Sequence, residues 1–312
     1  MKISVLVPVY GVERYISECA VSLFEQTYQD LEYIFVDDCS PDGSIEALRQ
    51  VMRRYPQRQA QVKILRHDRN RGLGAARATA LRAATADVVM VVDSDDVLPL
   101  DAVAKLWARM EQTQADMVDG AFCRLLPGGL QPPVLPFRGS EDHMLRLMLV
   151  HNTVSHHLWG WLVRRRLYTD NGINSIEGIN MAEDYAVTPR LLFCCARRAS
   201  IDDVVYHYRD NAESTFADNL TPRHIQSFLR ANATVYDFLK ERQADTRYRI
   251  PLMIGMLQVY HAALAAGVSM EKAEQTCGYH PGVLMRWLCS PRRLSWLRRY
   301  YLGLKFVYRH CL

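Results

Sequence analysis

The residues best suited to chemistry in this sequence lie at positions 93–96, where three aspartates surround one serine. Asp93 and Asp95 are two residues apart directly after an apolar run, so in an extended segment both carboxylates can point toward one divalent cation. Hard oxygen ligands suit Mg²⁺ or Mn²⁺, and such an ion bridges phosphates and neutralises a departing diphosphate. The pattern therefore predicts a site for a metal and a diphosphate.

Helix capping is the alternative explanation for these carboxylates. Asp96 or Asp101 would then cap a helix that starts near Pro99. A pair of carboxylates alone does not separate the two interpretations, but a second acidic turn at Asp37-Asp38, also after an apolar run, favours a ligand site. The sequence around that turn is ordinary turn chemistry that leads into a helix, although a carboxylate there can also accept a hydrogen bond from a base N–H.

Apolar runs of strand length alternate with helical periodicities through about residue 121, and these elements must position the carboxylates. The runs predict strands at 3–8, 32–36, 62–65, 88–92 and 117–122. Apolar residues at three- and four-residue spacing predict helices within 16–24, 45–55, 76–84 and 103–110. Repeated strand–helix units predict an α/β fold with a mainly parallel sheet and helices on both faces, in which ligands bind at the carboxyl ends of the strands.

A basic tail follows a mildly acidic body. No Asp or Glu follows Glu274, whereas seven Lys or Arg residues do, so residues 1–274 carry a formal charge of −3 although the chain total is +4. The stretch 284–312 mixes these charges with aromatic residues, and such a surface can lie on an anionic membrane leaflet. The same apolar residues can equally pack on the catalytic domain. No nucleic-acid-binding motif accompanies the charge, so nucleic acid is not an expected partner.

The start of the chain predicts a cytoplasmic location, because it lacks the apolar region and cleavage site of a signal peptide. The uncharged stretch 250–270 is long enough to cross a bilayer, but it contains Pro251, Gln258 and His261, and we therefore favour a buried helix. Eight cysteines without a C-x-x-C pair predict neither disulfides nor a zinc site in a reducing compartment.

The order of these motifs resembles that of the inverting glycosyltransferases of family 2, which have the GT-A fold. The resemblance rests on segments 5–10, 32–44, 70–77 and 93–96, then on a Trp-containing strand at 159–165, a Glu-Asp motif at 182–184 and a closing segment at 206–209 with Ser214. It implies a GT-A domain at 1–215, with a nucleotide-sugar half at about 1–122 and an acceptor half at about 123–215. Beyond it, helical periodicity predicts a helical C-terminal region at 216–312.

By this resemblance the chain is expected to move a hexosyl or N-acetylhexosaminyl group from a nucleotide-diphosphate sugar, with UDP favoured. The acceptor is expected to be a hydroxyl of a saccharide or lipid-linked molecule in cell-surface polysaccharide synthesis. The residues implied to bind the nucleotide sugar are Pro8, Val9, Tyr10, Glu13, Asp38, Asn70, Arg71, Gly72, Asp93, Ser94 and Asp95. Asp95 and Asp93 are the implied ligands of Mn²⁺ or Mg²⁺, and His207 is a further candidate ligand, although a His between two tyrosines is more often structural.

Asp184 is the implied base that removes the proton of the acceptor hydroxyl, and one direct displacement inverts the anomeric configuration. Glu183 and Trp159 are candidates for contact with the donor or acceptor sugar. A helix N-terminus also explains the Glu-Asp pair, and burial in the core also explains the tryptophan. The chain departs from the family pattern at 78–80 and 160–161, which leaves the contacts at those positions open.

Two other protein classes remain as alternatives. A metal-dependent phosphatase or phosphotransferase of the haloacid-dehalogenase type also has D-x-D after a buried strand, but its pattern has Thr where this chain has Val97. A non-catalytic sugar-nucleotide-binding protein would lose the metal ligand or the base, yet Asp95 and Asp184 are both present. The motifs do not select the transferred sugar or the nucleotide.

Overall fold

The computed structural model describes all residues except 152, 211–220, 283–285, 287–298, 301, 307 and 309–312. The chain divides into two compact units, each described here by itself. Unit 1 contains residues 1–138, 158–178 and 194–214, and unit 2 contains 139–157, 179–193 and 215–312. The sequence predicted one boundary near residue 215, whereas segments 139–157 and 179–193 group with the C-terminal helices. Local periodicity does not reveal this grouping, because it depends on which helices pack together.

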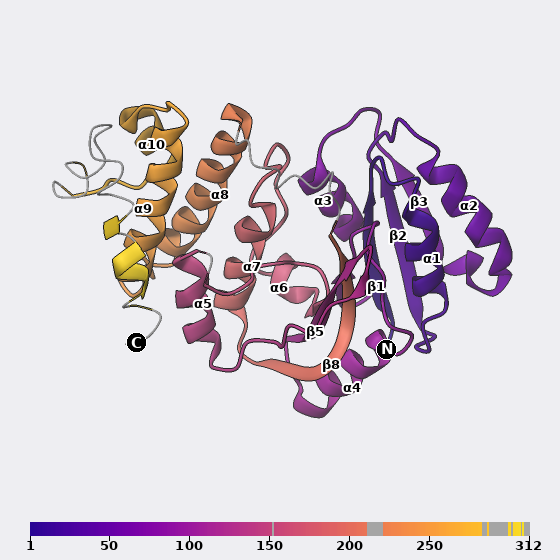
Figure 1. Cartoon of the computed structure of the whole chain (residues 1–312). Coiled ribbons are helices and arrows are strands. Elements are labelled where there is room, and N and C mark those ends of the chain that lie inside the picture. Colours follow the sequence, from indigo (N-terminus) through magenta and orange to yellow (C-terminus); the bar gives the residue numbers. More distant parts are fainter. Residues whose placement is uncertain are drawn as a thin grey trace. The chain divides into compact units, whose positions relative to one another are not determined.

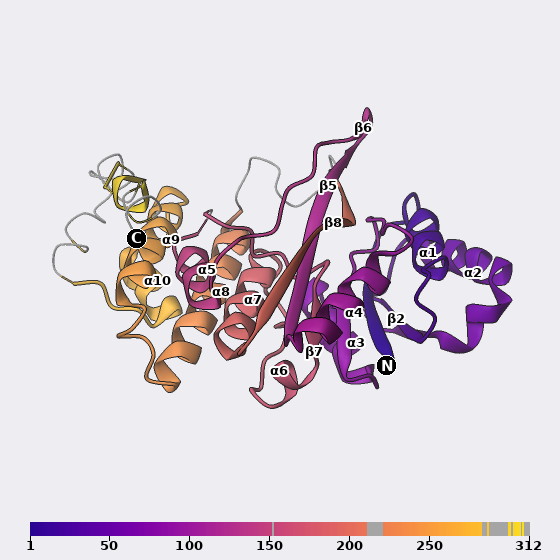
Figure 2. The ribbon, with the colours of Figure 1, turned by 90° about the horizontal axis from the view of Figure 1, so that it is seen from below.

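Unit 1 is built on one eight-stranded sheet in the order β3-β2-β1-β4-β7-β5-β6, with β8 paired to β5. The strands are β1 (Ile3–Val9), β2 (Leu31–Asp37), β3 (Val62–Arg66), β4 (Val88–Val91), β5 (Met117–Leu126), β6 (Gly129–Leu130), β7 (Leu162–Arg164) and β8 (Arg198–Arg209). Strands β1 to β4 are parallel, β7 runs antiparallel to both of its neighbours, and β8 runs parallel to β5. Figure 2 shows β5 and β8 as two long strands side by side. The predicted α/β fold with a mainly parallel sheet is confirmed.

Helices cover both faces of the parallel part of the sheet. These are α1 (Ile16–Phe24), α2 (Ser44–Arg54) and α3 (Leu73–Ala83), with a 3₁₀ turn η1 (Pro56–Gln61). Further along the sheet, α4 (Ala102–Thr113) packs on β8 and β5, and the short α6 (Arg166–Thr169) packs on β7. Beside β1 to β3, α1 and α2 lie on one face and α3 on the other (Figure 1). Every residue of β1 and β2 is buried, as expected for strands covered on both sides.

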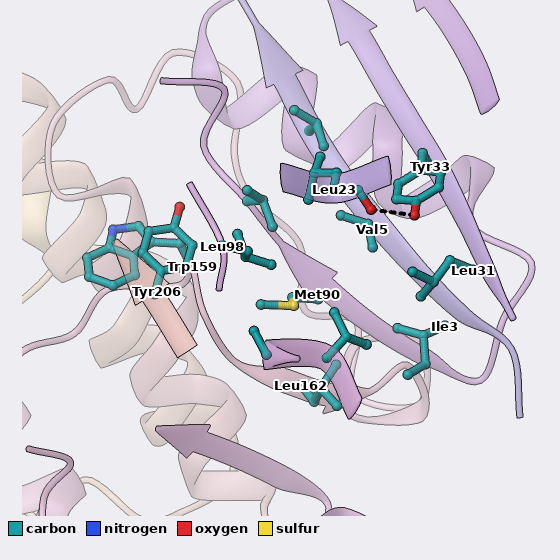
Figure 3. Close-up of a cluster of buried hydrophobic side chains, with 14 of the residues drawn as sticks. Ile3, Val5, Leu23, Leu31, Tyr33, Met90, Leu98, Trp159, Leu162 and Tyr206 are labelled. Atoms are coloured by element: carbon teal, nitrogen blue, oxygen red, sulfur yellow. Dashed lines mark hydrogen bonds between the residues drawn. The ribbon is translucent and has the colours of Figure 1, made fainter. Parts of the chain in front are cut away.

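The core of unit 1 joins the sheet to α1 and to the segment around Trp159 (Figure 3). Tyr33 is fully buried, and its hydroxyl donates to Leu23 O at 2.7 Å, so the ring packs in the core without an unsatisfied polar atom. Trp159 stacks on Tyr206 with ring centroids 4.3 Å apart. This stack connects the core to the end of β8.

Arginines close the amino ends of β4 and β5. Arg164 Nε donates to Ala115 O at 3.0 Å, and Arg165 Nε donates to Ala86 O at 2.7 Å. A cavity of about 560 Å³ at this edge is lined by Asp87, Gln114, Arg164, Arg165, Arg166 and Thr169. These arginines satisfy carbonyls at the strand starts, whereas the predicted ligand site follows the strand ends.

Unit 2 consists of helices α5 (Glu141–Leu149), α7 (Glu183–Cys194), of which Cys194 is counted with unit 1, α8 (Pro222–Glu241), α9 (Arg249–Ala265) and α10 (Met270–Cys277). Side chains of Ser140, Thr221 and Ser269 cap three of them. α9 confirms the helix expected within 250–270. Within the described part of the chain, no helix is long and apolar enough to cross a membrane.

Candidate functional site

The carboxyl ends of β1 to β4 meet at one edge of the unit 1 sheet. Val9 is in register with Asp37, which is in turn in register with Arg66, and Leu6 is in register with Val91. The residues that follow each strand therefore share this edge. The structure brings together the end of β1, with Pro8 and Val9, and the loops after β1, β2, β3 and β4, which hold the other residues predicted to bind the nucleotide sugar.

The residues predicted at the end of β1 and in the loop after it differ in exposure. Pro8 and Val9 are buried within the strand, whereas Tyr10 is 48% exposed. Glu13 ties this loop to the one after β2, because its Oε2 accepts from Gly43 N and its own N–H donates to Asp42 Oδ2, both at 3.0 Å. Glu13 therefore holds the loops after β1 and β2 together at this edge of the sheet.

Asp38 organises the loop after β3. Its Oδ1 accepts from Arg71 N at 2.9 Å and its Oδ2 accepts from Gly72 N at 2.7 Å. Asn70 Oδ1 also accepts from Gly72 N, at 3.0 Å. Gly72 has φ of +87°, a conformation that residues with a side chain rarely adopt. The Arg71 side chain pairs with Glu177 at 2.6 Å. The predicted residues 38 and 70–72 therefore form one hydrogen-bonded turn.

Asp93 is paired with an arginine to which the sequence prediction assigned no role. Nη2 of Arg77 on α3 donates to both carboxylate oxygens of Asp93, at 2.8 and 3.2 Å. The Arg77 side chain is 2% exposed and that of Asp93 is 23% exposed. A buried guanidinium therefore compensates the charge of Asp93 and fixes its orientation. Arg77 belongs to the matched segment 70–77, so its position was visible in the sequence, but its partner was not.

Asp96 fastens the loop after β4 to the end of β8. Its Oδ2 accepts from the Tyr206 hydroxyl and its Oδ1 from Arg209 N, both at 2.7 Å, while Asp93 N donates to Tyr206 Oη at 3.1 Å. Burial and the nearby carboxylates of Asp95 and Asp93 raise the pKa of Asp96 well above its usual range. Asp96 is therefore a structural anchor.

No helix cap explains the aspartates of this loop. α4 begins at Ala102 with Asp101 as the preceding N-cap residue, and the Asp101 side chain accepts no capping hydrogen bond. Its carboxylate instead pairs with Lys105 at 2.9 Å. The capping alternative for Asp96 and Asp101 is therefore not observed.

Asp95 lies between the two fixed carboxylates of this loop, and its carbonyl accepts from Arg209 Nε at 2.8 Å. Ser94 is buried. His207 pairs with Val97 through two backbone hydrogen bonds, and partial burial lowers the pKa of its imidazole, against the opposing charge of Glu18.

The described residues include no group of three or more His, Cys, Asp or Glu side chains placed to hold a metal. Asp93, Asp95 and His207 therefore do not form a preformed three-ligand cage. Mg²⁺ is usually bound by one or two carboxylates together with the phosphates of a substrate, and Asp95 beside the arginine-paired Asp93 fits that donor set. The role of His207 as a ligand stays a prediction.

Trp159 belongs to an aromatic cluster and is 7% exposed. Its ring lies nearly parallel to those of Tyr206 and Tyr208, with centroids 4.3 and 5.3 Å away, and edge-on to Phe122 at 5.1 Å. Figure 3 shows the stack with Tyr206. Trp159 is therefore a core residue, as the alternative explanation from the sequence proposed, and its contact with a sugar stays a prediction.

Glu183 and Asp184 begin α7 in unit 2, directly after Ala182, which has φ of +60°. The His156 ring lies edge-on to that of Tyr185, the residue after Asp184, with centroids 5.5 Å apart, and the imidazole hydrogen-bonds to the backbone of Val154. Burial lowers the pKa of His156, and the Asp184 charge opposes that shift, so the two groups interact. Sequence reasoning missed this histidine as a neighbour of the predicted base, because the two are 28 positions apart.

Residues 4–152 match the model of glycosyl transferase family 2. The chain is 28% identical over 246 residues to an uncharacterized glycosyltransferase, EpsJ, of Bacillus subtilis. The aligned residues cover 75% of this chain and 70% of EpsJ. It is 29% identical over 259 residues to a poly(ribitol-phosphate) beta-glucosyltransferase of Bacillus spizizenii, covering 81% of this chain but only 39% of that protein.

Solved structures share the fold. Residues 1–349 of TarS from S. aureus, in complex with UDP, match 99% of this chain and 89% of that one, with a TM-score of 0.66 and 20% identity. The mannosyltransferase PcManGT from Pyrobaculum calidifontis, in complex with GDP-Man and Mn²⁺, matches 98% of this chain and 86% of that one, with a TM-score of 0.53 and 19% identity.

Proposed function

Because residues 4–152 match the model of glycosyl transferase family 2 and the chain has the fold of solved glycosyltransferases, we propose that it is an inverting enzyme of that family that uses a nucleotide-diphosphate sugar, with uridine as the nucleoside. It transfers a hexosyl or N-acetylhexosaminyl group to a hydroxyl of a saccharide or lipid-linked acceptor. The observation that supports this most directly is the fixing of both carboxylates that flank Asp95, by Arg77 on one side and by Tyr206 on the other. The D-x-D phosphatase alternative gains no support from the family match.

The strand ends of unit 1 bind the leaving group in this proposal. Asp38 accepts from the nucleobase, Asp93 accepts from a ribose hydroxyl, and Asp95 would hold Mn²⁺ or Mg²⁺ at the diphosphate. When bound, the cation supplies positive charge at the diphosphate. The buried Arg77 balances the charge of Asp93, and Tyr206 anchors Asp96, so Asp95 is the carboxylate of this stretch that we assign to the cation and the phosphates.

Asp184 removes the proton of the acceptor hydroxyl. The acceptor oxygen forms a bond to the anomeric carbon while the bond from that carbon to the phosphate oxygen breaks, with its electron pair leaving on the diphosphate. The proton passes to the Asp184 carboxylate. A single displacement of this kind inverts the anomeric centre. Glu183, adjacent in the first turn of α7, is proposed to contact the sugar or the acceptor.

The named relatives support the acceptor class. One is a beta-glucosyltransferase and another, TarS of S. aureus, a beta-N-acetylglucosaminyltransferase, both named for poly(ribitol-phosphate). We therefore propose a polymer or lipid-linked acceptor of cell-surface polysaccharide synthesis. The chain spans less than two fifths of either relative's length, so we transfer the reaction class and not their particular polymer.

We propose that the basic tail contacts the anionic cytoplasmic face of a membrane. Trp287 and Trp296, on which the sequence prediction partly rests, lie outside the described residues. Of the described tail residues, Leu302 and Phe306 are 45% and 64% exposed. Replacing both with Glu should abolish co-sedimentation with phosphatidylglycerol vesicles, whereas Leu100→Glu, at an exposed apolar site of unit 1, should not. Equal loss in both variants would contradict the proposal.

A panel of UDP-, GDP- and TDP-sugars with Mn²⁺ tests the proposed reaction, with donor hydrolysis and transfer as readouts. Asp95→Asn should lower both by about a hundredfold or more. Asp184→Asn should lower transfer by about 10²- to 10⁴-fold and leave nucleotide binding unchanged. The matched control for Asp95→Asn is Asp87→Asn, at the opposite end of β4. The matched control for Asp184→Asn is Glu271→Gln, in the first turn of another helix, α10. Full transfer by Asp184→Asn would remove the base.

A further inference from the structure

A hydrogen-bonded chain of three side chains runs behind the loop after β2. His67 Nδ1 lies 2.6 Å from Asp38 Oδ1, and His67 Nε2 lies 2.9 Å from Thr79 Oγ1. The side chains of Asp38 and His67 are 3% and 6% exposed. Thr79 lies on α3, within the stretch 78–80 where the chain departs from the family pattern. Neither His67 nor Thr79 has a role in the mechanism proposed above.

The partners of His67 fix where its proton lies. Asp38 Oδ1 also accepts from Arg71 N, so as an ionised carboxylate oxygen it only accepts, and His67 Nδ1 must carry the hydrogen. At the other end, Arg82 Nη2 donates to Thr79 Oγ1 at 2.9 Å, which leaves the threonine hydroxyl hydrogen available to His67 Nε2. Thr79 thereby holds the ring so that it donates to Asp38.

These contacts leave Asp38 little capacity for a ligand. Within the described residues its carboxylate accepts three hydrogen bonds, two on Oδ1, from His67 and Arg71, and one on Oδ2, from Gly72. A carboxylate offers about four acceptor positions, so one remains, on Oδ2. With the side chain 3% exposed, at most one further donor can bind this carboxylate.

The number of donors on the base is what this arrangement discriminates. The Watson–Crick edge of uracil or thymine carries one N–H, at N3. Guanine carries an N–H at N1 and an amino group beside it, which bind a carboxylate best when both of its oxygens accept. His67 occupies the oxygen that the second donor would need.

We propose that His67, held by Thr79, is a specificity-determining residue that restricts the donor to a pyrimidine imide nucleotide, uracil or thymine, and disfavours guanine. The inference rests on the proposed function and deepens it. A guanine donor left without an acceptor in a buried site weakens binding by about ten- to a hundredfold, which is the preference expected for UDP or TDP over GDP.

Isothermal titration of the full-length protein with UDP, TDP and GDP, in the presence of Mn²⁺, tests this. His67→Phe removes the donor to Asp38 and keeps a ring in the space, so the ratio of the GDP to the UDP dissociation constant should fall at least fivefold. His67→Asn, which keeps a side-chain N–H near the position of Nδ1, should retain the ratio. Tyr33→Phe is the matched control, since it deletes a buried hydrogen bond on β2 away from Asp38, and it should not move the ratio.

A wild-type protein that binds GDP as tightly as UDP would overturn the inference, as would a folded His67→Phe variant with an unchanged ratio. A merely structural role for His67 would weaken all three nucleotides equally. If His67→Phe does not fold, Thr79→Val replaces it, and an unchanged ratio there overturns the inference. Failure of the proposed function gives a different result, namely no nucleotide binding by the wild type at all.

Discussion

Removing the Tyr206 hydroxyl tests how the loop 93–96 is held. The hydroxyl is the only group lost in Tyr206→Phe. It donates to Asp96 Oδ2 at 2.7 Å and accepts from Asp93 N at 3.1 Å. Tyr206 and Asp96 are both fully buried. Tyr33→Phe makes the same deletion at another fully buried tyrosine, whose single partner is the neutral carbonyl of Leu23.

The two deletions should differ severalfold in cost. A hydrogen bond to a charged group contributes about 1.5–3 kcal/mol, and a buried N–H left without its acceptor costs about 1–3 kcal/mol more. Allowing for relaxation of the loop, Tyr206→Phe should lower the free energy of unfolding of unit 1 by about 3 kcal/mol, and Tyr33→Phe by about 1 kcal/mol. Loss of the Tyr206 donor also removes an interaction that lowers the pKa of Asp96.

Urea unfolding of both variants gives the stability difference, and isothermal titration with UDP and Mn²⁺ gives the functional one. Because Asp93 and Asp95 belong to the loop that Tyr206 fastens, Tyr206→Phe should weaken UDP binding by about tenfold while Tyr33→Phe leaves it unchanged. Equal destabilisation by both variants, together with unchanged UDP affinity in Tyr206→Phe, would refute the anchoring role.

Three further predictions concern other contacts. Arg77→Met leaves the carboxylate of Asp93 without its buried partner, so it should lower the free energy of unfolding by about 3 kcal/mol and weaken UDP binding. Arg71→Met, at an exposed ion pair, should lower the free energy of unfolding by less than about 1 kcal/mol, and equal losses in the two variants on urea unfolding would contradict this. Burial lowers the pKa of His151 to about 3, so protonation favours the unfolded chain; the folding stability is full above the unfolded pKa near 6.5 and falls as pH decreases. Between pH 7 and 5 the wild type should lose about 2 kcal/mol more free energy of unfolding than His151→Asn in parallel urea titrations. Equal losses in the two proteins would contradict the burial of a neutral His151. Gly255→Ala should destabilise unit 2 by about 1–3 kcal/mol despite the higher helix propensity of alanine, because the added Cβ would lie 2.1 Å from Leu149 O. A melting temperature of the variant at or above that of the wild type would contradict this close approach.

The nucleotide half of the fold could be predicted from the sequence because its signals are local. Each of β1 to β5 is a short apolar run, and each of α1 to α4 has apolar residues at helical spacing, so strand ends and the residues after them follow from neighbouring positions. The same reasoning placed Asp38, Asp93 and Asp95 at one edge of the sheet. The register of parallel strands makes that placement dependable.

The contacts that hold these residues could not be predicted in this way. The bond between Asp96 and Tyr206 joins positions 110 residues apart, and β8 pairs with β5 through a register that shifts near Ala121. His67 and Thr79 are separated by the loop 68–72 and the first turns of α3, and neither spacing nor periodicity indicates that a histidine after β3 would donate to Asp38. Such contacts depend on side-chain geometry across strands.

The dependence of UDP affinity on Mn²⁺ in the wild type, Asp95→Asn and Asp87→Asn tests the role of Asp95 directly. Mn²⁺ should strengthen UDP binding in the wild type and in Asp87→Asn, and Asp95→Asn should remove at least tenfold of that enhancement. Binding of UDP that is independent of Mn²⁺ in the wild type, or an enhancement that Asp95→Asn leaves intact, would contradict the assignment of Asp95 to the cation and the diphosphate.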